Sequence, residues 1–515
     1  MTKKHAFILG ATLLLSLAGC ATNPVTGERE LSLVSEEKEL AIGAQQYEPA
    51  RQSQGGDFIL DPALTAYISE VGNKLAAVSD RKLPYEFKII NSSIPNAWAL
   101  PGGKITVNRG LLTYLNSEAE LAAVLGHEIV HAAAKHAVRQ MSRGMLLQTG
   151  VVAAVVGAQS SGYGGLAQMG AGLGAQLLST KYGRDAERES DHYGMIYMSR
   201  AGYDPQGAVE LQRTFVKLSA GRNQDWLSGM FASHPASEER VQNNLKMLQE
   251  LPTGGEVGAA RYKSKLAYLN TIKPAYDAYD KGRKALAKKD VAAAEKFAKQ
   301  AISIAPQEAL FYDLAGDIAI TNKQPQSALK QYDKAITSNP KFFYGYLMRG
   351  QVEYKLKQNQ KAKADLEKSL TMLPTGNAYL VLGHIAKAEQ DIAKAKSYYA
   401  KVASNKGKVG IAAYTALLEL DLQEHPNKYL KMRVGKSNQG GLAVEIANPT
   451  PKNIGGLQVL IQVADASGRP QQIQRNLRGS VAAGKKQIFD LGLQGLTDQQ
   501  LQSLKSKITA AQMVN

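Results

Sequence analysis

A 34-residue periodicity in the second half of the chain constrains its fold more than any other feature of the sequence. Small residues, prolines and ring or aliphatic residues recur at this interval in four registers: Gly282, Gly316 and Gly350; Pro306, Pro340 and Pro374; Ala294, Ala328 and Ala362; and Ala298, Tyr332 and Leu366. Three registers continue one residue early, at Gly383, Ala395 and Tyr399. An unrelated helical bundle would not keep several registers in phase, so we expect repeated helical units.

A period of 34 residues, with small residues where helices cross and a proline after the second helix, is typical of tetratricopeptide repeats. About four repeats fit within residues 275–410. Stacked helix pairs form a concave face that binds extended peptide. This segment holds 23 Lys+Arg and 13 Asp+Glu, a net charge of +10. We expect most of its lysines on solvated outer faces, and the alternative is a basic groove that selects acidic peptide.

The first 19 residues predict an export signal. Lys3 and Lys4 precede a short apolar run that ends at Cys20, the only cysteine of the chain. The run is shorter than the roughly 20 residues that a membrane span needs. "LAGC" resembles a bacterial lipoprotein signal, which implies that Cys20 is lipidated and begins the mature protein. The residue after it is Ala21, which by the same resemblance favours the outer membrane. A secretory peptide with a chance cysteine is the alternative.

With 515 residues the chain is too long for one core, and about three domains are expected. The predicted organisation is a mainly α, α+β domain over 20–252, a linker or helix over 253–274, the repeats over 275–410, a helix or linker over 411–430, and a small β-sandwich-like domain over 431–515. The net charge of +17 suggests an acidic partner, such as anionic lipid or acidic polypeptide. Because no nucleic-acid-binding motif is found, we expect no nucleic acid partner.

One short stretch of the first domain, "LGHEIVHAAAKHA", has the pattern of a metal-binding helix. His127 and His131 are four residues apart, so on a helix they project from one face and can share one zinc ion. Glu128 lies at the edge of that face, where it can act as a base on the attacking water. The alternative is a core helix with hydrogen-bonded histidines, but burying two histidines and a glutamate is costly.

Catalytic zinc usually has three protein ligands, so a third ligand is required. His136 lies about 900° around the helix from His127, on the opposite side. A helix-like segment over 185–198 offers Glu187 and Asp191, which are four apart and share a face. One of them can bind zinc while the other accepts the free N–H of a ligand histidine. Spacing alone leaves Glu189 open as the ligand.

Five stretches resemble one known family. They are "NPVTGERELSLVSEEKELAIG", "NAWALPGGKITVNRGLL", "LGHEIVHAAAKH", "DAERESDHYG" and "FASHPASEERV", and they lie between residues 23 and 241. They resemble the membrane-associated zinc metallopeptidases that include the CAAX prenyl proteases. The resemblance implies one zinc per chain on His127, His131 and Glu187, with Glu128 as the catalytic base. It places Asp191 beside a ligand histidine.

The resemblance also assigns two regions outside the metal motif. Residues 96–107 resemble the family's edge strand, which implies that Asn96, Ala97, Trp98, Ala99 and Gly103 bind substrate; the alternative is an ordinary hairpin. A peptide added as a strand is recognised through its main chain, so specificity can be loose. His234 has three open roles: a latch on the zinc, a stabiliser of the oxyanion, or a loop residue. Arg240 matches a family arginine with a structural role.

Residues 144–180 contain no charged side chain, but glycine, serine and glutamine interrupt the run. We expect flexible helices that line or cover the cleft, and membrane contact is the alternative.

Together these features predict a lipid-anchored zinc endopeptidase on the periplasmic side of a bacterial outer membrane. Its expected substrates are unfolded or partly folded envelope polypeptides, recruited by the repeats. The rival hypothesis is a chaperone or assembly factor with a latched protease site, whose repeats bind the outer-membrane protein assembly machinery.

Overall fold

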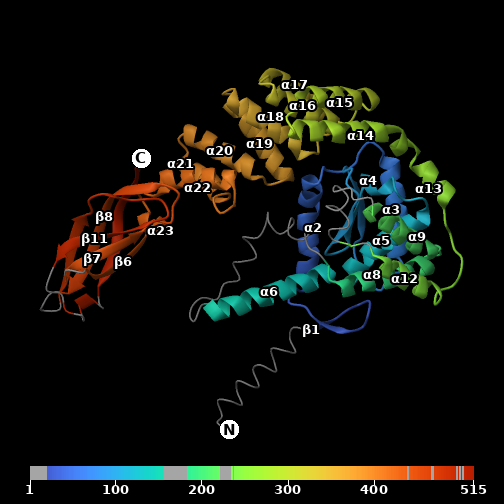
Figure 1. The fold of residues 1–515 in the computed structure, drawn as a ribbon, viewed down its shortest axis with the longest axis horizontal. Helices are drawn as coiled ribbons and strands as arrows, with labels where there is room; N and C mark the ends of the chain where they lie inside the picture. Colours follow the sequence, from blue (N-terminus) through green and yellow to red (C-terminus); the bar gives the residue numbers. More distant parts are fainter. Residues whose placement is uncertain are drawn as a thin grey trace, which may run out of the picture. The chain divides into compact units, whose positions relative to one another are not determined.

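The computed structural model (Figure 1) describes residues 20–155, 182–220, 234–235, 237–437, 440–464, 469–493 and 504–514, and the single residues 497, 500 and 501. The predicted export signal and residues 156–180 of the uncharged run lie outside the described residues. The chain forms two compact units. The first is Met1–Val352 with Thr371–Leu373, and the second is Glu353–Leu370 with Pro374–Asn515.

A three-stranded sheet of order β3-β5-β4 lies in the first unit. The strand-like runs of the sequence form β3 (Glu86–Ile90) and β5 (Lys104–Asn108), which pair in parallel. The third strand, β4 (Ala97–Leu100), pairs antiparallel with β5 and ends the sheet. A short hairpin of β1 (Cys20–Thr22) and β2 (Arg29–Leu31) precedes them.

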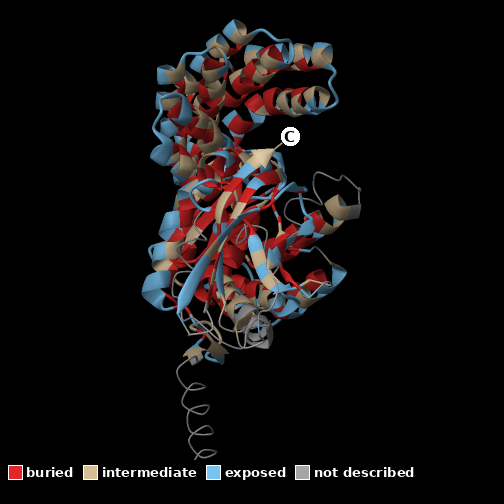
Figure 2. Ribbon diagram, turned by 90° about the vertical axis from the view of Figure 1, so that its left-hand side faces the viewer, coloured by how far each residue is buried: buried red, intermediate tan, exposed pale blue. Residues whose placement is uncertain are grey.

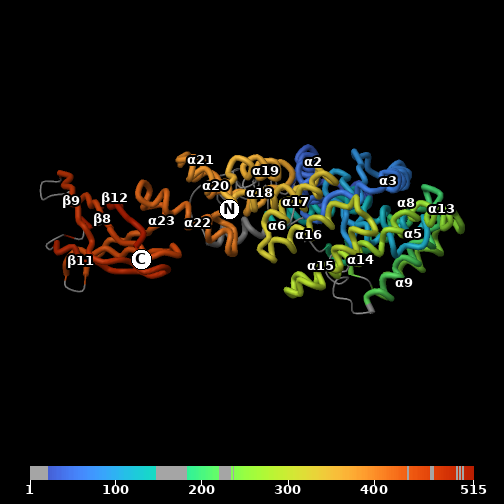
Figure 3. Tube along the Cα trace, turned by 90° about the horizontal axis from the view of Figure 1, so that it is seen from above, coloured from blue at the N-terminus to red at the C-terminus, as the bar shows by residue number. Residues whose placement is uncertain are grey.

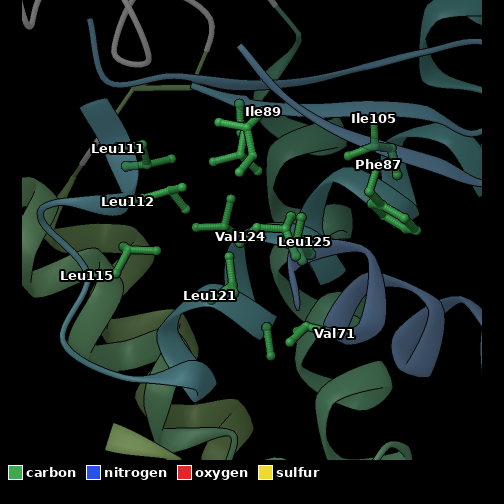
Figure 4. Packing of buried hydrophobic residues seen from close by; sticks show 14 of the residues in the cluster. Val71, Phe87, Ile89, Ile105, Leu111, Leu112, Leu115, Leu121, Val124 and Leu125 are labelled. Atoms are coloured by element: carbon green, nitrogen blue, oxygen red, sulfur yellow. The ribbon is translucent and has the colours of Figure 1, made fainter. Parts of the chain in front are cut away.

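Helices make up most of the rest of this domain. They are α2 (Glu36–Ser53), α3 (Pro62–Ala76), α4 (Arg109–Leu112), α5 (Glu118–Ala133), α6 (His136–Val155), α8 (Arg184–Arg200), α9 (Gln206–Ala220), α12 (Glu238–Leu248) and α13 (Ala259–Lys265). The Ser117 hydroxyl caps α5 by accepting a hydrogen bond from the backbone N–H of Glu120. Figure 4 shows Leu121, Val124 and Leu125 of α5 packed in the core of this domain.

Along the chain the helices of the repeats follow one another in pairs: α14 (Ala267–Ala287) and α15 (Val291–Ile304), α16 (Ala309–Thr321) and α17 (Pro325–Ser338), α18 (Phe343–Lys355) and α19 (Asn359–Met372), and α20 (Gly376–Ala388) and α21 (Ile392–Ala400). Helix α14 packs on α15, α16 packs on α17, and α20 packs on α21. The turn inside each pair holds one residue of positive φ, at Lys289, Lys323, Lys357 and Gln390. These positions are 34, 34 and 33 residues apart. The backbone therefore repeats with the predicted period, and the fourth repeat comes one residue early, as predicted. Figure 3 traces these helices.

Glycines in the repeats lie where one helix meets the ring of the next. A Cβ built on Gly316 would fall 2.4 Å from the Tyr332 ring, and one on Gly383 would fall 2.3 Å from the Tyr399 ring. The predicted small-residue registers thus mark close helix packing. Figure 2 shows buried residues on the inner sides of these helices and exposed residues along their turns.

The segment predicted as a linker packs on the first domain. The backbone N–H of Glu256 donates to the carbonyl of Gly202, and the carbonyl of Val257 accepts from the N–H of Ala119. Helix α14 begins at Ala267, before the predicted start of the repeats at residue 275.

After α22 (Lys408–Asp421) and α23 (Pro426–Tyr429), the chain forms two antiparallel sheets. One has the order β11-β7-β6, from β6 (Lys431–Lys436), β7 (Leu442–Ala447) and β11 (Lys486–Leu493). The other has β8 (Asn453–Ala464) between β10 (Ser480–Val481) and β12 (Lys505–Val514), with β9 (Pro470–Asn476) also paired to β8. Val444 of β7 and Val459 of β8 share one apolar core, as the predicted sandwich-like domain requires.

None of the helices in the described residues combines the length and the apolar character that crossing a membrane requires.

Candidate metal centre

Helices α5 and α8 approach closely at two glycines. A Cβ on Gly126 would lie 3.1 Å from the carbonyl oxygen of Gly194, and one on Gly194 would lie 3.2 Å from the backbone nitrogen of His127. Side chains at this crossing would push the helices apart. The close approach lets His127 of α5 and Glu187 of α8 face the same site.

Three predicted ligands converge there. The Nε2 atoms of His127 and His131 are 3.0 Å apart, as expected for two rings one helical turn apart. Glu187 Oε1 lies 3.4 Å from His131 Nε2, and Glu187 Oε2 lies 3.6 Å from His127 Nε2. All three side chains are buried. Burial raises the pKa of Glu187, but the surrounding histidines outweigh this and hold it well below its ordinary value.

Asp191 and Arg240 support His127 from behind. His127 Nδ1 lies 3.0 Å from Asp191 Oδ1, so its proton faces the carboxylate and its Nε2 lone pair faces the site. Arg240 donates two hydrogen bonds to Asp191, at 2.7 and 2.6 Å. Burial raises the pKa of Asp191, but Arg240 outweighs this and lowers it. Arg240 Nη1 also lies 3.3 Å from Glu187 Oε2.

Glu128 is fully buried beside the three candidate ligands. Neither of its carboxylate oxygens has a hydrogen-bond partner among the described residues. Burial raises its pKa, and the nearby His234 and His127 rings oppose that rise. A carboxylate held dry next to a reaction centre, with free acceptor atoms, suits a general base.

His234 reaches the same site from a different segment. Its Nδ1 lies 2.9 Å from Glu187 Oε1 and 3.3 Å from His127 Nε2. Its Nε2 lies 3.7 Å from Glu128 Oε1. One ligand atom from each of His127, His131, Glu187 and His234 lies within 4.8 Å of the others. The Tyr182 ring, not singled out in the sequence, stacks on His131 with centroids 4.0 Å apart.

Glu189, which spacing left open as a ligand, points away from this cluster. Its Oε1 lies 3.3 Å from His136 Nε2 and accepts a hydrogen bond of 2.9 Å from Asn23 Nδ2. Its Oε2 accepts from Arg139 Nη2 at 3.3 Å. Burial raises its pKa, but the His136 contact and the other partners outweigh this and lower it to about 2.

His136 contacts His131 through the ring nitrogen that faces away from the cluster. The two Nδ1 atoms are 2.7 Å apart. The sequence argument placed His136 on the far side of one continuous helix. Instead, α5 ends at Ala133, Lys135 takes a positive φ of 57°, and α6 starts in a new direction at His136. No glycine or proline signals this break, so spacing alone did not reveal the contact.

The predicted substrate-binding strand is the edge of its sheet. The structure shows no strand beside the outer edge of β4 within its described ranges. The side chains of Ala97, Trp98 and Ala99 are buried, and Trp98 packs edge-on against Tyr47. The carbonyl of Asn96 accepts from the N–H of Asn108 inside the sheet. The backbone of β4, rather than these side chains, is therefore the part that can meet a peptide.

Gly103 lies in the turn between β4 and β5 with a φ of 78°. A Cβ there would fall 2.8 Å from the Tyr85 ring. Both facts give Gly103 a role in the turn itself.

The donor set fits a metal ion. Two imidazole nitrogens and a carboxylate are common ligands of catalytic zinc. Glu187 Oε2 is buried without a hydrogen-bond partner among the described residues, and the two facing Nε2 atoms would both have lone pairs to donate. A cation between them would satisfy all of these atoms.

Most residues of this site lie in a part of the chain that matches a known protein family. The model of peptidase family M48 matches residues 62–248, and that of the tetratricopeptide repeat matches 344–374 and 376–408. The β-barrel assembly-enhancing protease of Yersinia pestis is 29% identical over 239 residues, which cover 45% of this chain and 48% of that protein. A mitochondrial metalloendopeptidase of Schizosaccharomyces pombe is 32% identical over 231 residues, covering 44% and 66%.

The metalloprotease YcaL of Escherichia coli K12 is 32% identical over 184 residues, which cover 34% of this chain and 69% of YcaL. The chain spans about half the length of the first of these relatives. A metalloprotease family implies a bound metal, which the convergence of His127, His131 and Glu187 can supply with ligands. The expected metallopeptidase domain and repeats are confirmed: this chain belongs to peptidase family M48 and carries tetratricopeptide repeats after its peptidase domain.

Proposed function

We propose that this protein is a zinc-dependent endopeptidase of the bacterial cell envelope that degrades misfolded or stalled outer-membrane polypeptides. The observation that carries the proposal is the buried convergence of His127, His131 and Glu187 beside Glu128, whose carboxylate oxygens have no hydrogen-bond partner among the described residues. Each of these residues would be costly to bury without a partner. A zinc ion and an attacking water would supply the partners.

Zinc in this site would polarise the scissile carbonyl and lower the pKa of water. Glu128 accepts a proton from the attacking water as the new C–O bond forms. It then returns the proton to the amine nitrogen as the C–N bond breaks. Asp191 and Arg240 keep His127 in the tautomer whose Nε2 lone pair faces the site. No covalent bond to the protein is formed.

Substrate would add to the outer edge of β4 as an extended strand. Since the side chains of this strand are buried, recognition would run through main-chain hydrogen bonds. Such binding selects unfolded chain over a specific sequence. This suits a protease for misfolded polypeptides.

His234 would hold the site closed at rest. Its ring is buried and lies within hydrogen-bond distance of Glu187, among the three proposed ligands. A fourth protein ligand would occupy the position that a catalytic zinc keeps open. Opening would then require movement of the segment that carries His234. A structural or oxyanion-stabilising role is the alternative.

Lipidation at Cys20 would hold the protein at the periplasmic face of the outer membrane. The "LAGC" pattern supports this localisation. Cys20→Ser should prevent acylation, measured by labelling with a radioactive fatty acid. Continued labelling of a Cys20→Ser protein would contradict the assignment.

A second candidate function is assembly of outer-membrane proteins, with the protease site seldom open. The repeats favour it, since their regular helix pairs form a surface for extended peptide. The name of the Yersinia pestis relative, a β-barrel assembly-enhancing protease, points the same way. Partners of the repeats would be unfolded barrel proteins or their assembly machinery.

Degradation of casein and of an unfolded β-barrel protein tests the main proposal. The purified wild-type chain should cleave them, and chelation should stop the reaction. Glu128→Gln should keep its zinc but lose cleavage, because only the base is removed. Cleavage by Glu128→Gln at the wild-type rate would refute the mechanism. Binding of the barrel protein without cleavage by the wild type would favour the assembly function.

A further inference from the structure

The two proposed histidine ligands have different supports. His127 rests on Asp191, whereas the outward nitrogen of His131 meets another histidine, His136. His136 approaches Glu189 of α8, and Glu189 in turn contacts Asn23 of the N-terminal hairpin, which the mechanism does not use. These partners form a continuous chain of contacts.

A metal bound by His131 would fix the direction of the hydrogen bond between His131 and His136. If His131 presents its Nε2 lone pair to a metal, its Nδ1 carries the proton. It must then donate to His136 Nδ1 across their 2.7 Å separation. The proton of His136 is thereby placed on Nε2, which lies 3.3 Å from Glu189 Oε1. This separation lies within ion-pair range, although Nε2 makes no hydrogen bond to any of the described residues.

Glu189 is itself held by two other elements. Arg139 of α6 donates to its Oε2, and Asn23 of the N-terminal hairpin donates to its Oε1 at 2.9 Å. Arg139 also pairs with Glu30 of the same hairpin. The Asn23 carbonyl oxygen of the side chain accepts from the backbone N–H of Val25 and so shapes the hairpin turn. The hairpin therefore reaches the supports of His131.

We propose that His136, Glu189 and Asn23 are positioning residues that orient the metal-binding ring of His131. This inference rests on the proposed function, because it concerns the same metal site. It assigns a use to the "NPVTGE" segment, residues 23–28, which is otherwise remote from the site in sequence. Second partners of ligand histidines fix their tautomer and raise their basicity. The hairpin thus stabilises the metal site.

The test measures zinc affinity of the metal-free, full-length protein by competition with a chromophoric chelator, with zinc alone as the probe. His136→Leu keeps a side chain branched at Cγ but cannot accept a hydrogen bond. We expect it to weaken zinc binding by about 10- to 100-fold, the range for such partners. His136→Asn places an oxygen where Nδ1 stood, and should restore most of the lost affinity.

Asn23→Asp provides a third variant. It keeps the oxygen that shapes the hairpin turn but replaces the donor to Glu189 with a second carboxylate oxygen. We expect a loss below about tenfold. His192→Ala is the matched control, because this exposed histidine of α8 has no contact with the metal site and should bind zinc like the wild type.

Thermal melting of the metal-free proteins separates orientation from folding. If the metal-free variants melt at the wild-type temperature and His136→Leu binds zinc like the wild type, the inference is wrong. The inference is also wrong if His136→Asn binds zinc as weakly as His136→Leu. Restoring the hydrogen-bond acceptor would then have no effect on zinc affinity, as expected if His136 only fills space. A wild-type chain that binds no zinc would overturn the proposed function as well. The inference is supported if His136→Leu binds zinc weakly and His136→Asn regains most of the lost affinity.

Discussion

The helix that carries the proposed metal ligands and the helices of the repeats differ in what they bury. All 16 residues of α5 are buried, including His127, Glu128 and His131. In the 14-residue helix α17, only Ala328, Tyr332 and Ala335 are buried. A helix that is buried all round must satisfy each polar group with a specific partner. A repeat helix has one narrow apolar stripe and leaves the rest to solvent.

This difference separates the expected effects of substitution. Around α5, the buried polar side chains contact one another, so the loss of one leaves other buried groups without partners. In the repeats, the stripe contributes packing, and a change there should alter stability without altering chemistry. The contrast can be tested with variants from each region.

The largest effect is expected for Glu187→Ala. Glu187 is buried, and its carboxylate oxygens lie within 3.6 Å of the Nε2 atoms of His127 and His131. Its loss would leave only the two histidines of the proposed ligand set. Metal analysis after dialysis should find zinc in the wild type and essentially none in Glu187→Ala. Asp185→Ala, a change of a fully exposed carboxylate on the same helix, is the control and should retain zinc.

If Glu187→Ala kept its zinc, another residue would be the third ligand. Metal analysis of Glu189→Ala would then show whether Glu189 is that ligand. Our assignment requires that Glu189→Ala keeps stoichiometric zinc when the metal is in excess.

His234→Ala should change the rate rather than the metal content. Removing a ring that lies 2.9 Å from Glu187 would free the position needed for hydrolysis, so cleavage of unfolded protein should rise several-fold with zinc still bound. An oxyanion-stabilising histidine predicts the reverse, a loss on the order of 10²-fold. Cleavage rates at equal zinc content decide between them. An unchanged rate would make His234 a structural residue of the site.

The sequence predicted those parts of the molecule in which residue type and spacing alone determine the local structure. The pair His127 and His131 follows from helix geometry, and the 34-residue registers follow from helix packing. The positive-φ residues of these turns are lysines and a glutamine rather than glycines, so their sequence gave no signal of the turns. The position of the repeats was nonetheless predictable from glycine, alanine and proline.

Three features could not be predicted from spacing. The contact of His136 depends on a break at Lys135 that has no glycine or proline. The role of Glu189 depends on Asn23, which lies 166 residues away in sequence. The burial of the Trp98 side chain depends on its packing against Tyr47 of another element. Each requires the tertiary fold.

A stability effect without a chemical one is expected for Gly316→Ala in the repeats. The new Cβ would fall 2.4 Å from the Tyr332 ring, which is itself buried, so the helices must separate. Overpacking costs about 1–3 kcal/mol, more than the roughly 1 kcal/mol that alanine gains over glycine in a helix. Urea unfolding should show a net loss of stability, with zinc content unchanged.

Gly435→Ala is the control for that change, because a Cβ at this position meets no atom within 4 Å. Gly383→Ala should behave like Gly316→Ala, since its Cβ would meet the Tyr399 ring at 2.3 Å. Equal stability of Gly316→Ala and the wild type would show that the repeats tolerate wider helix spacing. The contrast with α5 would then be weaker than we infer.

The last expected effect is a gain in stability at Ser190 of α8, which departs from the rule that each buried polar group has a partner. Its hydroxyl is fully buried and has no hydrogen-bond partner within the described part of the chain. Such a group costs about 1–3 kcal/mol, and alanine is the better helix former. Ser190→Ala should therefore raise the free energy of unfolding by about 1.5 kcal/mol or more and leave zinc binding unchanged.

Ser264→Ala, on the exposed side of α13, measures the gain from helix propensity alone, about 0.5 kcal/mol. The excess at Ser190 over Ser264 is then the cost of the unpaired hydroxyl. Ser190 borders a cavity of about 20 Å³ beside Glu128 and Asp191, large enough for one water. A loss of stability in Ser190→Ala would mean that a water in this cavity pairs with the hydroxyl. In that case Ser190 would follow the same rule as His127 and His131 of α5, whose buried ring nitrogens have partners.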